Sequence, residues 1–179
     1  MNVDDVLLMI LEASPNGVPG KTAIQKIGYF CSERLHFDMG YYAHYYGPYS
    51  RIVEKNLQSL KDFDFIEIEQ VTTGKNRNMY KIELNEDGSV IVSDLIKTYS
   101  EQYKTINEVV NICLQENMDY NILSYAAKIY YILKEEKREI STSELVELAS
   151  YHDWKLSRTD IDSATTLLTT YGVQISHIT

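Results

Sequence analysis

The spacing of apolar residues changes along the first 85 positions, and this change constrains the fold more than any other feature. Apolar residues recur every three or four positions over 4–13, 21–35 and 51–63, which predicts three amphipathic helices. The period becomes two over 65–69 and again over 78–84, on either side of a turn-like Thr72–Asn76 segment. That alternation predicts a β-hairpin, so the expected order is helix, helix, helix, hairpin.

Two connections interrupt the helical pattern. Residues 14–20 contain two prolines and two glycines, which predicts a tight turn between the first two helices. In the second connection, 41–50, half of the residues are tyrosine and Gly47-Pro48 interrupts the run. We interpret it as an extended or looped piece that leads into the third helix, with Ser50 as the N-cap.

The second half of the chain is predicted to be mostly helical. Seven residues alternate spacings of four and three over about three heptads, a pattern typical of one long helix whose seam faces another helix: Val92, Ile96, Tyr99, Tyr103, Ile106, Val110 and Cys113. Amphipathic segments follow at 120–133, 143–150 and 159–171, and 172–178 could form a weak hairpin or strand. We expect an α-rich α+β protein with a winged-helix-like domain at 1–85, whose wing is the β-hairpin, and an acidic helical domain at 86–179. The helix order of 141–175 leaves open a second winged helix.

A winged helix can place its third helix in the major groove and its wing against the DNA backbone. The residues with suitable side chains are Arg51, Lys55 and Gln58 on the third helix and Lys75 and Arg77 in the wing. The alternative interpretation is a solvated helix face and a soluble hairpin tip.

Net charge divides the chain unevenly. The protein has 17 basic and 26 acidic residues, a net charge of −9, which opposes any function that needs a broadly basic surface. Residues 1–85 carry 9 bases and 11 acids, whereas 86–179 carry 8 and 15. Within the first half, 70–82 holds three bases and no acid. Charge therefore does not exclude DNA contact by the predicted wing.

Two short segments carry a family resemblance. They are residues 20–30, GKTAIQKIGYF, and residues 46–50, YGPYS, followed by an amphipathic helix. Together they resemble the SocA/Panacea-type antitoxin-associated domains and the related YwgA-like bacterial and archaeal proteins, over roughly residues 1–85. Isoleucines stand at 24 and 27 where leucines are usual in those families. The resemblance implies a non-enzymatic module of toxin–antitoxin, regulatory or phage-defence context, with no single defined biochemical activity.

Two sets of residues are candidates for protein contacts. The tyrosines could form an interaction surface, because tyrosine combines a large contact area with few rotamers; the alternative is that some are core residues and the others cover the second helix. These residues are Tyr41, Tyr42, Tyr45, Tyr46 and Tyr49. The heptad seam from Val92 to Val110 could mediate a homodimer, or it could pack on 120–133 within the chain.

The sequence contains no pattern that indicates a catalytic, metal or cofactor site. The four histidines are scattered, Cys31 lies on the apolar face of a helix, and the two cysteines lack metal-ligand spacing. No phosphate-binding loop, dinucleotide motif or protease motif occurs. We therefore expect no enzyme, no cofactor and no metal. The two distant cysteines and the lack of an apolar run of membrane-spanning length lead us to expect a cytoplasmic protein without a membrane anchor.

Two functions follow from these patterns. The first is a regulatory or antitoxin-like binding protein whose main partner is another protein, with the acidic second half contacting a basic surface. The second is a winged-helix transcriptional regulator that binds duplex DNA.

Overall fold

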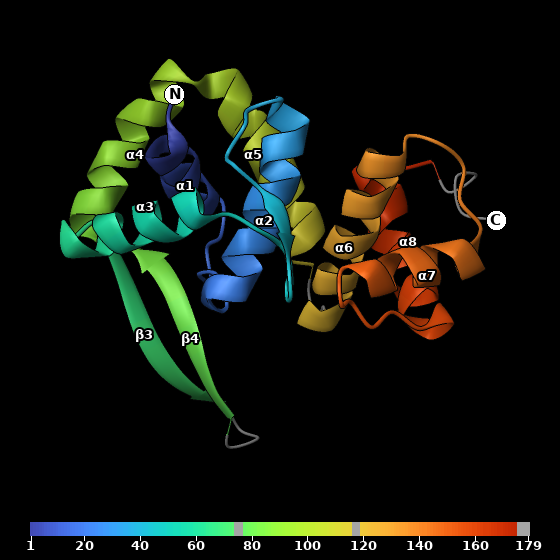
Figure 1. Cartoon of the computed structure of the whole chain (residues 1–179). Helices are drawn as coiled ribbons and strands as arrows, with labels where there is room; N and C mark the ends of the chain where they lie inside the picture. The colour runs from blue at the N-terminus through green and yellow to red at the C-terminus, as the bar shows by residue number, and fades with distance from the viewer. Residues whose placement is uncertain (74–76, 116–118, 175–179) are drawn as a thin grey trace. The chain divides into compact units, whose positions relative to one another are not determined.

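The computed structural model describes residues 1–73, 77–115 and 119–174 (Figure 1). Over these residues it contains eight helices and two antiparallel hairpins, which confirms the α-rich α+β class. The chain forms two compact units, which we describe separately. Unit 1 comprises Met1–Gly40 and Ser50–Leu114, and unit 2 comprises Tyr41–Tyr49 and Gln115–Thr179.

Helix α1 (Val3–Glu12) is the centre of unit 1. Six consecutive residues, from Val6 to Leu11, are buried, so α1 is covered on all sides and not on one face. It contacts α2 (Gly20–Leu35), α3 (Arg51–Asp62) and strand β4 (Arg77–Leu84). An Asn2–Asp5 capping box satisfies the N–H groups at its start. The three helices expected in the first half are therefore present, within a residue of their expected bounds.

The expected hairpin is formed by β3 (Ile66–Thr73) and β4 (Arg77–Leu84), which extends from unit 1 below α3 in Figure 1. Its register pairs Ile66 with Leu84 and Ile68 with Ile82. The connection between α1 and α2 joins this hairpin through a bridge, in which the backbones of Val18 and Ile82 exchange hydrogen bonds of 2.8 and 2.9 Å. Buried Val18 and Ile82 fix the hairpin base to the helices.

The prediction of a single long helix from the heptad seam is wrong. The chain forms α4 (Glu86–Thr98) and α5 (Ser100–Cys113), which are separated at Tyr99, whose φ of −120° and ψ of 45° are not helical. The seam pattern continues across the break because α4 packs on α1, whereas α5 packs on both α1 and α2. Val92, Ile106 and Val110 are at most 1% exposed. They belong to the core of unit 1 and are not available as a dimer seam.

A buried amide fixes the start of α3. The Gln25 side chain donates through Nε2 to the Ser50 carbonyl and accepts from the Ser50 N–H, both at 2.9 Å. The Ser50 hydroxyl donates to the Met39 carbonyl at 2.5 Å and accepts from the N–H of Val53, which caps α3 as expected. These bonds join Gln25, Met39 and Ser50 within unit 1.

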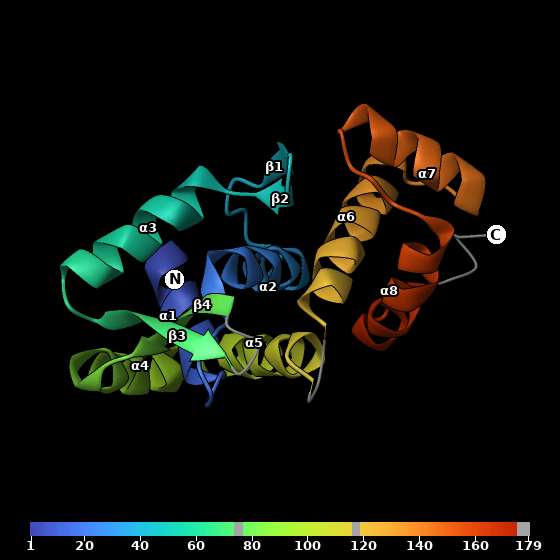
Figure 2. The same ribbon diagram turned by 90° about the horizontal axis from the view of Figure 1, so that it is seen from below.

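Unit 2 contains a short hairpin and three helices. The hairpin consists of β1 (Tyr42–His44) and β2 (Gly47–Tyr49). The helices are α6 (Tyr120–Glu136), α7 (Thr142–Tyr151) and α8 (Arg158–Tyr171). Helix α6 packs along α8, and α7 contacts both (Figure 2). The expected strand at 172–178 is not present over Gly172–Gln174, and its remainder lies outside the described residues.

These units do not follow the 1–85 and 86–179 ranges expected from the sequence. Helices α4 and α5 complete the core of unit 1, whereas the tyrosine-rich hairpin groups with α6–α8. The charge change at residue 86 reflects surface composition, and it does not report which helices share a core.

We expect Gln25→Leu to lower the free energy of unfolding by about 2–4 kcal/mol, because two buried backbone groups of Ser50 lose their partners. The control is Gln58→Leu, because Gln58 is exposed and its bond to Asp62 is exposed too. That substitution should lower the free energy of unfolding by less than about 0.5 kcal/mol. Urea unfolding followed by circular dichroism measures both values, and equal losses would contradict the assignment.

Candidate functional site

The tyrosine-rich segment forms a tight hairpin in unit 2. Its register pairs Tyr42 with Tyr49 and His44 with Gly47, so Tyr45 and Tyr46 form the turn. Gly47 has a φ of +98°, a conformation in which a side chain would be strained. This glycine lets the chain reverse directly after two bulky residues.

The structure separates the five tyrosines into two groups. Tyr45 and Tyr46 are 62% and 63% exposed and Tyr42 is 36% exposed, whereas Tyr41 and Tyr49 are half-buried. The sequence left open whether these residues form a surface or a core. Both occur, because alternate residues of the short strands face opposite sides and the turn faces solvent.

Trp154 anchors the hairpin to the helical part of unit 2. Its indole Nε1–H donates to the His44 carbonyl at 2.6 Å, and its side chain is 2% exposed. Asp153, just before it, adopts the left-handed conformation with a φ of +58°, which turns the chain after α7. Tyr131 on α6 packs edge to face on Trp154, with ring centroids 5.7 Å apart. His152 lies 4.7 Å from the indole.

The rings of the hairpin also pack on one another. His44 lies against Tyr49, with centroids 4.8 Å apart and planes at 30°. Tyr45 and Tyr46 are perpendicular, at 88°, with centroids 5.0 Å apart. Buried His44 Nδ1 makes no hydrogen bond within the described residues. The result is a small sheet held by stacking, with two tyrosine rings at its tip.

Burial raises the pKa of the Tyr131 hydroxyl, and the charge of Glu135 acts in the same direction. A hydrogen bond with the backbone of Ala43 acts in the opposite direction and links Tyr131 to β1. Tyr131, His152 and Trp154 were not identified from the sequence as site residues. No local spacing could reveal them, because Trp154 and its acceptor are 110 residues apart.

The predicted DNA-contacting residues of the third helix lie on one exposed face of α3. Arg51, Lys55 and Gln58 are exposed, opposite the buried Val53 and Leu57. The face is not uniformly basic. Gln58 donates to Asp62 at 2.8 Å, and Glu54 is exposed on the same helix.

The predicted wing residues are described only in part. Lys75 lies outside the described residues, and Arg77 is placed in β4 without a description of its side chain. Nearer the hairpin base, Lys81 forms an ion pair with Glu83 at 2.5 Å. Glu67 pairs with Glu83 in the register, so the base of the hairpin carries acidic charge beside its one lysine.

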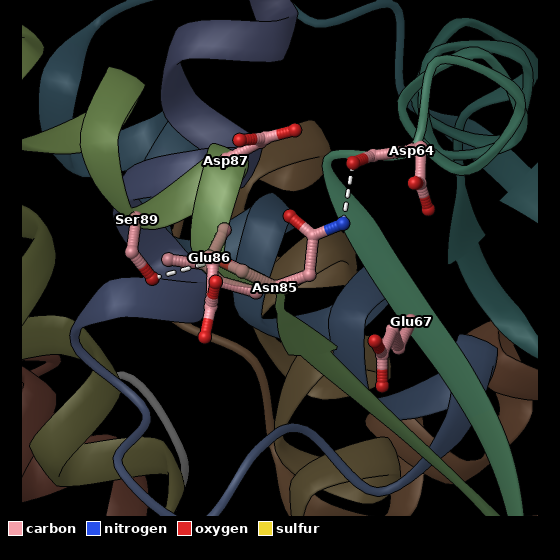
Figure 3. Close-up of a pocket in the computed structure, with 7 residues that line it drawn as sticks. Asp64, Glu67, Asn85, Glu86, Asp87 and Ser89 are labelled. Atoms are coloured by element: carbon pink, nitrogen blue, oxygen red, sulfur yellow. Dashed lines mark hydrogen bonds between the residues drawn. The ribbon is translucent and has the colours of Figure 1, made fainter.

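An open hollow of about 750 Å³ lies where β3, β4 and α4 meet (Figure 3). Asn85 caps α4 and donates from its side chain to the Asp64 carbonyl, while Ser89 donates to the Asn85 carbonyl. The carboxylates of Glu67, Glu86 and Asp87 lie apart from one another in Figure 3, and all three residues are exposed. The hollow is therefore a capped helix start with solvated acids.

The structure explains why this junction needs a glycine. A Cβ at Gly88 would lie 2.1 Å from the Phe65 carbonyl oxygen, which is too close for any side chain. Gly88 therefore lets the first turn of α4 rest on the start of β3.

Metal and nucleophile chemistry was not expected from the sequence. Among the residues that the structure describes, no three His, Cys, Asp or Glu side chains group as ligands for one metal ion. Cys31 and Cys113 are buried in unit 1, and burial raises the pKa of both thiols, so neither is a thiolate at neutral pH.

No protein-family profile matches the chain, and no curated protein matches it. None of the described helices combines the length and the apolar character that crossing a bilayer requires.

We expect Trp154→Phe to lower the stability of unit 2 by about 1–3 kcal/mol, because the buried His44 carbonyl loses its donor. Hydrogen exchange should show faster exchange at Tyr42–Tyr49 and little change in α1. The matched control is Tyr151→Phe, because the Tyr151 hydroxyl bonds to Glu147 at the surface. Unchanged exchange in the hairpin would show that the indole does not anchor it.

Proposed function

We propose that the protein is a non-enzymatic, antitoxin-like regulatory protein that acts by binding another protein through the hairpin Tyr41–Tyr49. The observation that carries this proposal is the pre-ordered aromatic turn. Tyr45 and Tyr46 expose most of their area, while the backbone beneath them is fixed by the Trp154 bond to His44. Exposed tyrosines on a rigid support lose little entropy on binding, which is a property of strong contact residues.

The family resemblance supports the same proposal. It rests on residues 20–30 and 46–50, and the structure gives two of these residues a joint role, since Gln25 binds the backbone of Ser50. The second segment contains Tyr46, at the exposed turn. The resemblance therefore coincides with the chain segments that build and position the proposed surface.

The partner surface is expected to be basic. Unit 2 carries ten acidic and six basic residues, a net charge of −4. The hairpin itself carries no Lys, Arg, Asp or Glu. An acidic module with a neutral aromatic tip favours a protein surface with positive charge over a phosphate backbone.

Partner capture tests this proposal. The tagged full chain should retain one protein from its native host at low salt. A Tyr45→Ala/Tyr46→Ala variant should lose it, with an affinity about 30-fold or more below that of the wild type, since two contact residues are removed. The control is Tyr151→Ala, because Tyr151 is another tyrosine of unit 2 and is 72% exposed. If the double variant retains the same protein, or if the wild type yields only itself, the proposal is wrong.

A second candidate function is DNA binding by unit 1 as a winged helix. Two observations favour it: the exposed face of α3 with Arg51 and Lys55, and the Val18–Ile82 bridge, which makes the α1–α2 connection a third strand-like edge of the hairpin. We propose that these helices and the bridge form a winged helix, with the hairpin as its wing. Helix α3 has a net charge of only +1, and the base of the hairpin is acidic, so this candidate is placed second.

Titration of a labelled 30-bp duplex at about 50 and 200 mM salt tests this candidate. Arg51→Ala/Lys55→Ala and Lys75→Ala/Arg77→Ala should each weaken binding and lower the salt slope by about 2. The matched control is Lys97→Ala/Lys104→Ala on the exposed sides of α4 and α5. If no duplex binds at low salt, or if all variants bind equally, unit 1 is not a DNA-binding module.

A further inference from the structure

The tip of the hairpin is an aromatic corner formed by the rings of Tyr45 and Tyr46. The rings are perpendicular, at 88°, and their centroids are 5.0 Å apart, so one ring presents its edge to the face of the other. Both side chains are more than 60% exposed, which leaves ring faces open to solvent. We call this pair the tyrosine corner.

The face of an aromatic ring is the negative end of its quadrupole and attracts cations, whereas its edge is positive. Two rings at right angles can therefore both contact one cation. Arginine suits such a place better than lysine, since its planar guanidinium stacks on a ring and sheds water more readily.

The charges around the tyrosine corner favour a cation over a nucleobase. A surface that stacks bases of a nucleic acid needs positive charge for the phosphates. From Tyr41 to Tyr49 the chain has no Lys or Arg, and unit 2 has four more acids than bases. No cation of the hairpin itself competes for the ring faces.

The support beneath the tyrosine corner fixes its geometry. The His44 ring lies against Tyr49 at 4.8 Å and approaches Tyr46 at 6.0 Å, and the His44 carbonyl accepts from buried Trp154. The turn is thus held on both sides by a packed sheet and an indole. Because the tyrosine corner is preorganised, it loses little conformational entropy when a ligand binds.

We infer that the tyrosine corner binds an arginine side chain of the partner protein by cation–π contact. This inference rests on the proposed function, because it names what the partner presents to the hairpin. It goes further in predicting that charge, and not apolar area, is what the two rings recognise.

A peptide titration tests the inference without the partner. The probes are Ac-Gly-Arg-Gly-Ser-Arg-Gly-NH2 and the same peptide with both arginines replaced by citrulline, which has nearly the same shape and no charge. Ring signals of ¹³C-labelled tyrosine report binding. The arginine peptide should shift the Tyr45 and Tyr46 signals in a saturable way, with an affinity at least about fivefold above that of the citrulline peptide.

Two variants separate the π face from the rest of the side chain. Their affinities are measured by isothermal titration calorimetry, because both variants lack the two tyrosine signals. Tyr45→Phe/Tyr46→Phe keeps the faces and should bind within about threefold of the wild type, whereas Tyr45→Leu/Tyr46→Leu keeps apolar area and should lose the preference for arginine. Unchanged Trp154 fluorescence and circular dichroism verify the fold of each. Equal affinity for both peptides, or equal shifts at exposed Tyr151, would overturn the inference.

Partner capture distinguishes this inference from the proposed function. Retention of the partner by the phenylalanine variant and its loss from the leucine and alanine variants would support both. Retention by the leucine variant and loss from the alanine variant would overturn arginine recognition and leave the hairpin as the binding surface. Retention by all variants would overturn the proposed function itself.

Discussion

The side-chain amide of Gln25 holds the backbone of unit 1 at the residue that caps α3. It pairs with both backbone groups of Ser50, at a point where the serine is fully buried and water cannot substitute. The same serine caps α3 and bonds to Met39 on the outgoing side of the hairpin. The start of α3 therefore depends on a small group of polar contacts within unit 1, which apolar packing could not replace because it would leave the backbone groups unpaired.

Local periodicity accounts for most of the elements. The spacing of apolar residues located the bounds of α1, α2, α3 and β4 within one residue, whereas β3 extends four residues beyond its predicted end. The apolar spacing did not predict the break at Tyr99, because the heptad pattern continues on both sides of it. Helix α4 buries its part of the seam against α1, and α5 buries its part against α1 and α2. A heptad count records which positions are buried, and it carries no information about a change of helix axis.

The candidate site could be predicted only in part. The high tyrosine content and Gly47 marked this segment in the sequence. The strands β1 and β2 could not be predicted, since three residues are too few to establish a period. The contact of Trp154 with His44 joins segments 110 positions apart, so no local pattern contains it. The grouping of residues 41–49 with α6–α8 is likewise a property of packing. The change in net charge at residue 86 also gave no guide to the two units, because the acids after residue 85 are divided between them.

The position of the indole has a practical consequence. The chain has one tryptophan, and its N–H bonds to the backbone of the hairpin proposed to meet a partner. Tryptophan emission depends on the hydrogen bonding and solvent access of the ring. The protein thus contains an intrinsic optical probe of its own hairpin, which reports whether residues 41–49 are docked in unit 2 without any added label.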